Sequence, residues 1–128
     1  MITKELAGCV IYNDKGELLV LHRNTPHLTQ WELPGGKIRQ GESAENSAVR
    51  ELREELSIKV KILRYLGGAE FVQNNIKWNY NWLEAEIVNG EPSIGEPDIF
   101  DNFSYFSIKE LTKMNDISPN LVNLLKVI

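Results

Sequence analysis

The chain has few of the residues that would place it in several large classes of protein. It has one cysteine, Cys9, so no internal disulfide can form, and its place in an apolar run predicts a buried, unreactive thiol. The two histidines, His22 and His27, lack the spacing of zinc ligands, and we expect them to be structural or surface residues. This use of cysteine is typical of a reducing, cytoplasmic setting.

Long hydrophobic runs and excess positive charge are also missing. No stretch of about 18 apolar residues occurs, and the N-terminus has no basic, apolar leader, so we expect a soluble protein without a membrane partner. Lysine and arginine number 14 against 18 acidic residues, a net charge of −4, which argues against binding to nucleic-acid polymers. A small phosphorylated ligand remains compatible, because metal ions can neutralise its charge locally.

Length and composition favour one compact domain over residues 1–128. A chain of 128 residues with 42% hydrophobic content can bury roughly two-thirds of the surface of its unfolded form. Internal repeats, low-complexity segments and linkers are not found. We therefore expect a single globular domain.

Short apolar-rich runs predict strands. The expected strands are 5–12, 17–22, 60–66, 78–88 and 103–106. The polar turn at 13–16 predicts a hairpin, so the chain should begin as antiparallel sheet. Residues 24–30 predict a surface loop, and Gly67-Gly68 and 73–75 predict interruptions.

Two segments carry helical signals. Residues 43–56 have Ser43 as an N-cap and a stripe of apolar side chains, namely Ala48, Val49, Leu52 and Leu56. Ser118 followed by Pro119 predicts a second helix that runs to about Val127. The order of elements indicates a mixed sheet with helices packed on its faces.

The first helix should gather carboxylates on one face. Glu51, Glu54 and Glu55 stand at positions i, i+3 and i+4, within an arc of roughly 100°. Oxygen-rich clusters suit Mg²⁺ or Mn²⁺. Without a cation the arrangement is unfavourable, because negative charge in the last turn costs about 0.3–1 kcal/mol for each group. The alternative is a solvated acidic face next to Arg50 and Arg53.

The segment from Gly36 to Ile58 resembles the Nudix box, G-x5-E-x7-R-E-U-x-E-E-x-G-U with U apolar. One fixed position departs from this pattern, because Ser57 stands where the box has its last glycine. Glycine supplies a left-handed conformation there, which costs serine about 1 kcal/mol. The flanking stretches 31–36 and 95–97 also resemble the family. The resemblance implies class α/β (α+β), an α/β/α sandwich with a mixed β-sheet.

The same resemblance implies a metal site. Glu54 and Glu55 would bind Mg²⁺, with Mn²⁺ as the other candidate ion, and the carbonyl of Gly35 would complete the inner coordination. Glu51 would act as general base or would bind a second ion, and both roles stay open. A further ligand in many relatives follows a long strand, and the candidate here is Glu96.

Other residues receive supporting roles from the resemblance. Arg50 would orient the neighbouring carboxylates through Glu42. Gly36, with its neighbour Gly35, would let the backbone approach the ion closely. Two acidic residues near Glu96 are alternatives to it, namely Asp98 and Asp101.

The overall resemblance is to MutT-type nucleoside triphosphate diphosphohydrolases, which implies a purine nucleotide as substrate. Arg23 would contact the substrate, Phe71 would pack on the base, and Asn120 would read the purine edge, although Asn120 could equally be a polar residue of the helix's first turn. Three aromatic residues alternate along one strand and could stack on a base or belong to the core, namely Trp78, Tyr80 and Trp82.

The implied function is Mg²⁺-dependent hydrolysis of a pyrophosphate bond in a nucleotide, such as 8-oxo-dGTP, to the monophosphate and pyrophosphate. ADP-ribose and nucleotide sugars are the main alternative substrates. A nucleotide-sensing module without activity is a lesser alternative, since such a module would be expected to lack box glutamates and this chain has all of them. A third alternative, an α/β domain that only binds other proteins, would leave the acidic face unexplained. Relatives are often dimers, so a homodimer is compatible with the family.

Overall fold

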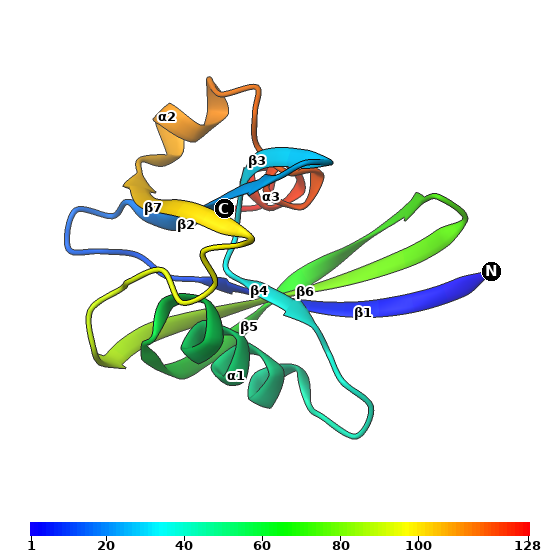
Figure 1. Ribbon diagram of the computed structural model, residues 1–128, viewed down its shortest axis with the longest axis horizontal. Coiled ribbons are helices and arrows are strands. Elements are labelled where there is room, and N and C mark those ends of the chain that lie inside the picture. The colour runs from blue at the N-terminus through cyan, green and yellow to red at the C-terminus, as the bar shows by residue number, and fades with distance from the viewer.

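The structure is a computed structural model that describes all residues from 1 to 128 (Figure 1). In chain order its elements are β1 (Ile2–Val10), β2 (Leu18–Thr25), β3 (Leu28–Glu32), β4 (Gly35–Lys37), α1 (Ala44–Leu56), β5 (Lys59–Gln73), β6 (Ile76–Asn89), β7 (Phe100–Phe106), α2 (Ile108–Thr112) and α3 (Pro119–Leu125).

The strands form two sheets. The larger sheet has the order β4-β1-β6-β5, in which β1 and β6 run parallel and the other neighbours are antiparallel. The smaller sheet has the order β3-β2-β7 and is antiparallel throughout. The expected mixed sheet is therefore confirmed in the larger of the two.

Helices cover the strands from opposite sides (Figure 1). α1 packs on a cluster that includes Cys9, Leu21 and Leu83, whereas α2 and α3 pack on a second cluster that includes Val20 and Trp82. Both clusters exclude water almost completely. This layering confirms the expected α+β sandwich.

α1 agrees with its sequence signals at both ends. The Ser43 side chain accepts a hydrogen bond of 3.0 Å from the Asn46 amide, and Leu52 and Leu56 are fully buried. After the last turn Ser57 has φ 57° and ψ 34°, and its N–H donates to the Arg53 carbonyl. Serine thus adopts the left-handed conformation that the pattern assigns to glycine.

The expectation that the chain begins as antiparallel sheet is wrong. The turn at 13–16 forms, since the Asn13 amide donates to the Glu17 carbonyl at 3.0 Å. However, β1 and β2 then enter different sheets, and only an isolated bridge between Tyr12 and Leu18 joins their ends. β1 instead pairs with β4 and β6, because turn chemistry determines the local reversal but not the partner of each strand.

Two boundaries also differ from those expected. The segment 24–30 is mostly strand, since β2 and β3 pair from Leu21 and Glu32 out to Thr25 and Leu28. Gly67-Gly68 does not end a strand, because β5 continues to Gln73 through irregularities in its pairing with β6. At Gly68 a Cβ atom would collide with the backbone of Tyr80, which explains a glycine inside this strand.

The interruption at 73–75 is confirmed, as a two-residue turn. Asn74 and Asn75 have φ 52° and 60°, and positive φ at both positions is the requirement of a tight turn that matches the strand twist. The sequence did not predict the short elements β4 and α2, whereas α3 begins at Pro119 as expected and ends at Leu125.

Candidate functional site

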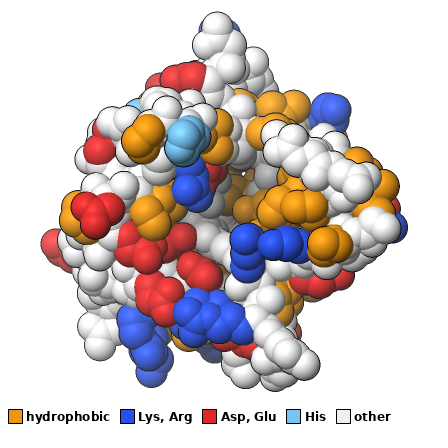
Figure 2. Space-filling view, turned by 45° about the vertical axis from the view of Figure 1, so that its right-hand side comes forward, with side chains coloured by type: hydrophobic (Ala, Val, Ile, Leu, Met, Phe, Trp, Pro, Cys, Tyr) orange, Lys and Arg blue, Asp and Glu red, His pale blue; other side chains and the backbone are white.

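A cavity of about 460 Å³ opens between the end of α1 and the β5–β6 hairpin. Figure 2 shows a hollow with acidic side chains gathered on one side and hydrophobic side chains on the opposite side. The acidic residues that line the cavity include Glu51, Glu54, Glu55 and Glu96. The cavity is also lined by Arg23, Glu32, Gly35, Gly36, Phe71, Trp78, Tyr80 and Asn120.

Glu55 is the most deeply buried of these carboxylates, with 4% of its surface exposed. Its Oε1 accepts a hydrogen bond of 2.8 Å from the Gly35 amide. Burial raises the pKa of Glu55 well above its ordinary value, the Gly35 hydrogen bond lowers it, and the negative charges of Glu51, Glu32 and Glu96 raise it again. Acidic groups thus surround Glu55, and no protein cation is hydrogen-bonded to it.

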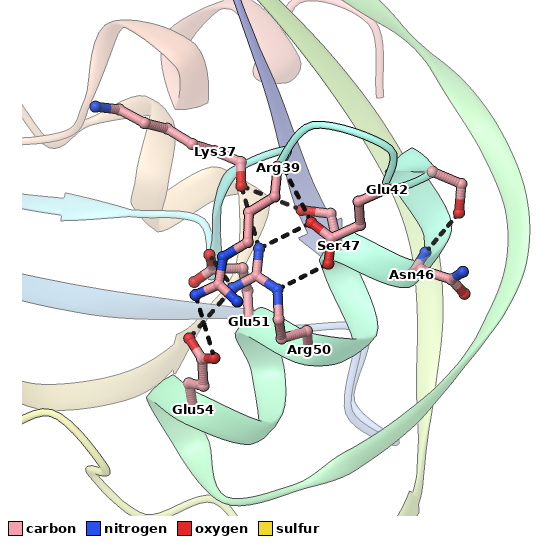
Figure 3. A network of polar contacts seen from close by, with 9 residues as sticks. Lys37, Arg39, Glu42, Asn46, Ser47, Arg50, Glu51 and Glu54 are labelled. Carbon is pink, nitrogen blue, oxygen red and sulfur yellow. Dashed lines mark hydrogen bonds and ion pairs between the residues drawn. The ribbon is translucent and has the colours of Figure 1, made fainter.

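Arg50 connects the other carboxylates (Figure 3). Its guanidinium donates to both oxygens of Glu42, at 2.8 and 2.9 Å, and to Glu51 at 2.9 Å. A weaker bond of 3.3 Å reaches Glu54, and one of 3.2 Å reaches the carbonyl of Lys37. The hydrogen bonds from Arg50, followed by that from the Arg39 amide, lower the pKa of Glu42 to about 2.

Two glycines allow the chain to pass close to these carboxylates. Gly35 has φ +147°, and a Cβ atom there would collide with the carbonyl of Ala7 on β1. At Gly36 a Cβ atom would lie 2.8 Å from the carboxyl carbon of Glu51. The side chain of Glu51 thus occupies the space that glycine leaves, and larger residues would displace it.

Glu96 reaches the site because its loop docks on the end of α1. The amide of Gly95 donates to the Glu55 carbonyl at 2.9 Å, and a Cβ atom on Gly95 would collide with the carbonyl of Glu54. Burial, then the charges of Glu51 and Glu54, raise the pKa of Glu96. Glycine at 95 therefore permits the contact that brings Glu96 to the cavity.

The two alternatives to Glu96 do not line the cavity. Asp98 is exposed. Asp101 accepts hydrogen bonds of 2.6 Å from His22 and 2.8 Å from Asn24. Of the three candidates, Glu96 alone is placed beside the carboxylates of α1. His22, which is hydrogen-bonded to Asp101, also packs against Trp31 with ring centroids 4.7 Å apart and planes inclined by 52°, which agrees with its expected structural role.

The donor set fits a hard divalent cation, although the side chains do not surround one in this arrangement. No group of three acidic, histidine or cysteine side chains is arranged to hold an ion, and Arg50 engages Glu51 and Glu54 instead. All of the candidate side-chain ligands are carboxylates, which suit Mg²⁺ or Mn²⁺. At Gly35 the structure shows the amide bound to Glu55, and the expected carbonyl ligand stays a prediction.

Arg23 lines the cavity, and its side chain is paired with Glu32. The Glu32 carboxylate accepts two hydrogen bonds from the Arg23 guanidinium, at 3.0 and 2.8 Å. The guanidinium also lies 5.1 Å from the centre of the Phe100 ring. Glu32 was not predicted as a site residue. The pairing of β2 with β3 brings it beside Arg23, whereas the sequence predicted a surface loop over 24–30.

Aromatic residues form the hydrophobic side of the cavity. Phe71 and Trp78 lie with ring centroids 6.3 Å apart and planes inclined by 18°. The ammonium groups of Lys4 and Lys37 lie 5.9 and 5.8 Å from the Trp78 ring centre. Trp82, in contrast, is only 3% exposed and belongs to the core. Of the three alternating aromatics, Trp78 and Tyr80 line the cavity, whereas Trp82 packs in the core cluster of α2 and α3.

Comparisons with known proteins agree with this geometry. The family described as NUDIX domain matches residues 3–125. The chain belongs to the Nudix family. The MutT Nudix hydrolase of Burkholderia pseudomallei superposes on it with a TM-score of 0.90 at 26% identity, over 100% of this chain and 99% of that one.

Curated Nudix relatives match over part of their length. An RNA pyrophosphohydrolase of Shigella boydii is 29% identical over 105 residues, which is 70% of this chain and 58% of that protein. A putative 8-oxo-dGTP diphosphatase of Bacillus subtilis is 36% identical over 61 residues, 48% of this chain and 40% of that protein. The chain thus spans about half the length of these two relatives.

The Nudix box of this chain borders the cavity. Its three helical glutamates line the cavity, and its arginine connects two of them, Glu51 and Glu54, to Glu42. Its one departure, Ser57, lies at the exposed helix end away from the lining. No helix of the protein is long and apolar enough to span a membrane.

Proposed function

We propose that this Nudix protein hydrolyses a pyrophosphate bond in a small nucleotide, with Mg²⁺ as cofactor and Mn²⁺ as a substitute. The observation that carries the proposal is the division of one cavity into a carboxylate side and an aromatic side. A phosphate chain and a base need these two environments next to each other. The excess negative charge around Glu55 supports a cation between protein and phosphate.

Each residue of the carboxylate side receives a role. Glu54, Glu55 and Glu96 would hold the ion, together with the carbonyl of Gly35. When bound, the ion would polarise the phosphoryl oxygens and neutralise the charge of the leaving group. Glu51 would accept the proton of the attacking water or bind a second ion, and Arg50 would keep its carboxylate in position, as it does in the present structure.

We propose a purine nucleoside triphosphate, oxidised forms such as 8-oxo-dGTP included, as the substrate. Phe71 and Trp78 would stack on the base, Asn120 would bind its edge, and Arg23 would contact the substrate from the strand opposite. The B. subtilis relative named for 8-oxo-dGTP and the MutT structure support this choice. The relatives named RNA pyrophosphohydrolase make a 5′-triphosphorylated RNA the second candidate.

The test is product analysis on a panel of substrates with Mg²⁺ and with chelator. The panel contains nucleoside triphosphates, 8-oxo-dGTP, ADP-ribose, a nucleotide sugar and a 5′-triphosphorylated RNA oligonucleotide. We expect metal-dependent release of pyrophosphate and a nucleoside monophosphate from a triphosphate. A sugar phosphate as product would replace this assignment by ADP-ribose or nucleotide-sugar hydrolysis, and binding without any turnover would identify a sensing module.

We further propose that the protein acts in the cytoplasm on small molecules, and that it forms a homodimer as many relatives do. Sedimentation velocity over a range of protein concentrations measures the second point. A monomer at every concentration would contradict it.

A further inference from the structure

The amide of Asn120 has a fixed orientation. Asn120 lies in the first turn of α3, and 4% of its surface is exposed. Its Oδ1 lies 2.8 Å from Nε1 of Trp82 on β6. An indole nitrogen can only donate, so the amide oxygen must face Trp82 and the amide nitrogen must take the opposite direction. Trp82 itself is 3% exposed, so this bond is shielded from bulk solvent.

The other end of this amide has no partner. Nδ2 of Asn120 is buried and makes no hydrogen bond within the protein, and Asn120 lines the cavity. The Nε1 atom of Trp78, another lining residue, is likewise buried and without a partner. Buried donors of this kind cost about 1–3 kcal/mol each when they stay unpaired, so a ligand that offered acceptors to them would relieve that cost.

We propose that Trp82 is a positioning residue that locks the Asn120 amide so that the cavity presents an N–H donor to the nucleobase. The inference deepens the proposed function and rests on it, since it assumes that the base occupies the aromatic side. A 6-oxopurine places a carbonyl acceptor at its edge, whereas a 6-aminopurine places a donor there. The fixed amide N–H therefore donates a hydrogen bond to the carbonyl of a 6-oxopurine. It cannot pair with the amino group of a 6-aminopurine, because both groups are donors.

The role of Trp82 follows from what its removal would allow. An asparagine amide without a fixed partner can rotate by 180° about its terminal bond, which exchanges donor and acceptor. A rotated Asn120 would accept a hydrogen bond from the 6-amino group of adenine. Selectivity between the two edges thus depends on Trp82, which does not line the cavity.

The test measures binding rather than turnover, so it can fail independently of the proposed hydrolysis. Inosine and adenosine monophosphate differ at the 6-position and in the protonation of N1, and they carry the same phosphate. Calorimetry with both, in the presence of chelator, gives the ratio of their dissociation constants. We expect the wild-type protein to favour inosine monophosphate at least about tenfold, as sites built around a hydrogen bond do. Trp82→Phe should bring the ratio to about one.

Three variants separate positioning from support of the fold. Trp31→Phe removes an indole that packs beside the same core but does not line the cavity, and it should keep the wild-type ratio. Asn120→Leu removes the amide and should abolish the preference. In the double variant, Trp82→Phe should then have no further effect on the ratio, because the two residues act through one bond.

Equal binding of the two nucleotides by the wild-type protein would overturn the proposal, as would a preserved ratio in folded Trp82→Phe. If Trp82→Phe does not fold, nuclear magnetic resonance of the wild-type protein decides the question. Inosine monophosphate should shift the side-chain NH₂ signals of Asn120 and leave the Trp82 indole N–H protected from exchange. Unmoved Asn120 signals at saturation would overturn the proposal.

Discussion

Arg50 makes more polar contacts at the site than any other side chain. It binds Glu42 through two parallel hydrogen bonds and holds Glu51 and Glu54 with a third nitrogen. A lysine has a single ammonium group and cannot reproduce this fork. The charge of Arg50 therefore matters less than its shape.

We expect Arg50→Lys to lower kcat by roughly 10–100-fold, the usual effect of losing a residue that orients metal ligands, with little change in KM. Arg53→Lys on the same helix is the matched control, because Arg53 is exposed and makes no ion pair. Steady-state kinetics with saturating Mg²⁺ measures both variants. Equal activity of the two variants would show that Arg50 does not position the carboxylates.

Glu55 is expected to lower the stability of the metal-free protein and yet to be required for activity. The folded, metal-free protein holds a proton at Glu55 more tightly than the unfolded chain, because burial raises the pKa of this carboxyl. The stability associated with that proton is present below the ordinary pKa of 4.5 and is lost as pH rises above it. At neutral pH and above, Glu55 thus destabilises the metal-free fold.

We therefore expect Glu55→Gln to raise the free energy of unfolding in chelator by about 1–3 kcal/mol near pH 8, while turnover with Mg²⁺ falls by orders of magnitude. The glutamine keeps an oxygen that can accept the Gly35 hydrogen bond. Glu86→Gln, at an exposed position of β6, should change neither quantity. Urea unfolding across a pH series measures the stability, and full activity of Glu55→Gln would contradict its role as a metal ligand.

Among the elements, α1 shows a local cost at its end. Ser57 is held in the left-handed region at φ 57°, where a side chain is unfavourable. We expect Ser57→Gly to raise the free energy of unfolding by about 1 kcal/mol, measured by urea denaturation. Ser57→Ala keeps the unfavourable conformation and should give no such gain. Equal stabilisation by both would point to the serine hydroxyl instead.

The helices could be predicted from sequence because their signals are local. Ser43 caps α1 and Ser118 caps α3 through contacts that span three residues. Strand partners could not be predicted in this way. β1 was assigned to the neighbour next to it in sequence, but it pairs with β6, and polar residues concealed the β2–β3 hairpin.

The site divides along the same line. The spacing of Glu51, Glu54 and Glu55 predicted that they share one face of a helix, and all three line the same cavity. The bond between Trp82 and Asn120 joins residues that are 38 positions apart and lie in different elements, so no local pattern contains it. Local sequence patterns thus predict the grouping of the carboxylates, whereas the residues of the aromatic side were proposed only from the resemblance to the family.

In the whole molecule, Cys9 reports on the integrity of the core. It is fully buried in the cluster beneath α1, and burial followed by the charge of Glu55 raises its pKa to about 12. The native thiol should therefore stay unreactive even at about pH 10. Reaction with a disulfide reagent then requires that the core opens.

We expect labelling of Cys9 in the native protein to be at least about a thousandfold slower than in guanidinium chloride, given an unfolding free energy of ~5 kcal/mol or more. Absorbance of the released thiolate measures the rate. Because the native pKa lies above its ordinary value of 9.0, stability should also fall as pH rises from about 9 toward 12. Rapid labelling with unchanged circular dichroism would instead reveal local opening of β1.

The pairing of β1 has a consequence for how the protein forms on the ribosome. β1 lies between β4, which contributes three residues, and β6, where Ile2 pairs with Ile76 and Val10 with Glu84. At ~5–20 residues per second, the first strand waits roughly 4–15 s for its long partner to be synthesised. During that interval the apolar side chains of Leu6, Cys9 and Val10 lack their partner strand, and exposed apolar surface of this kind favours aggregation.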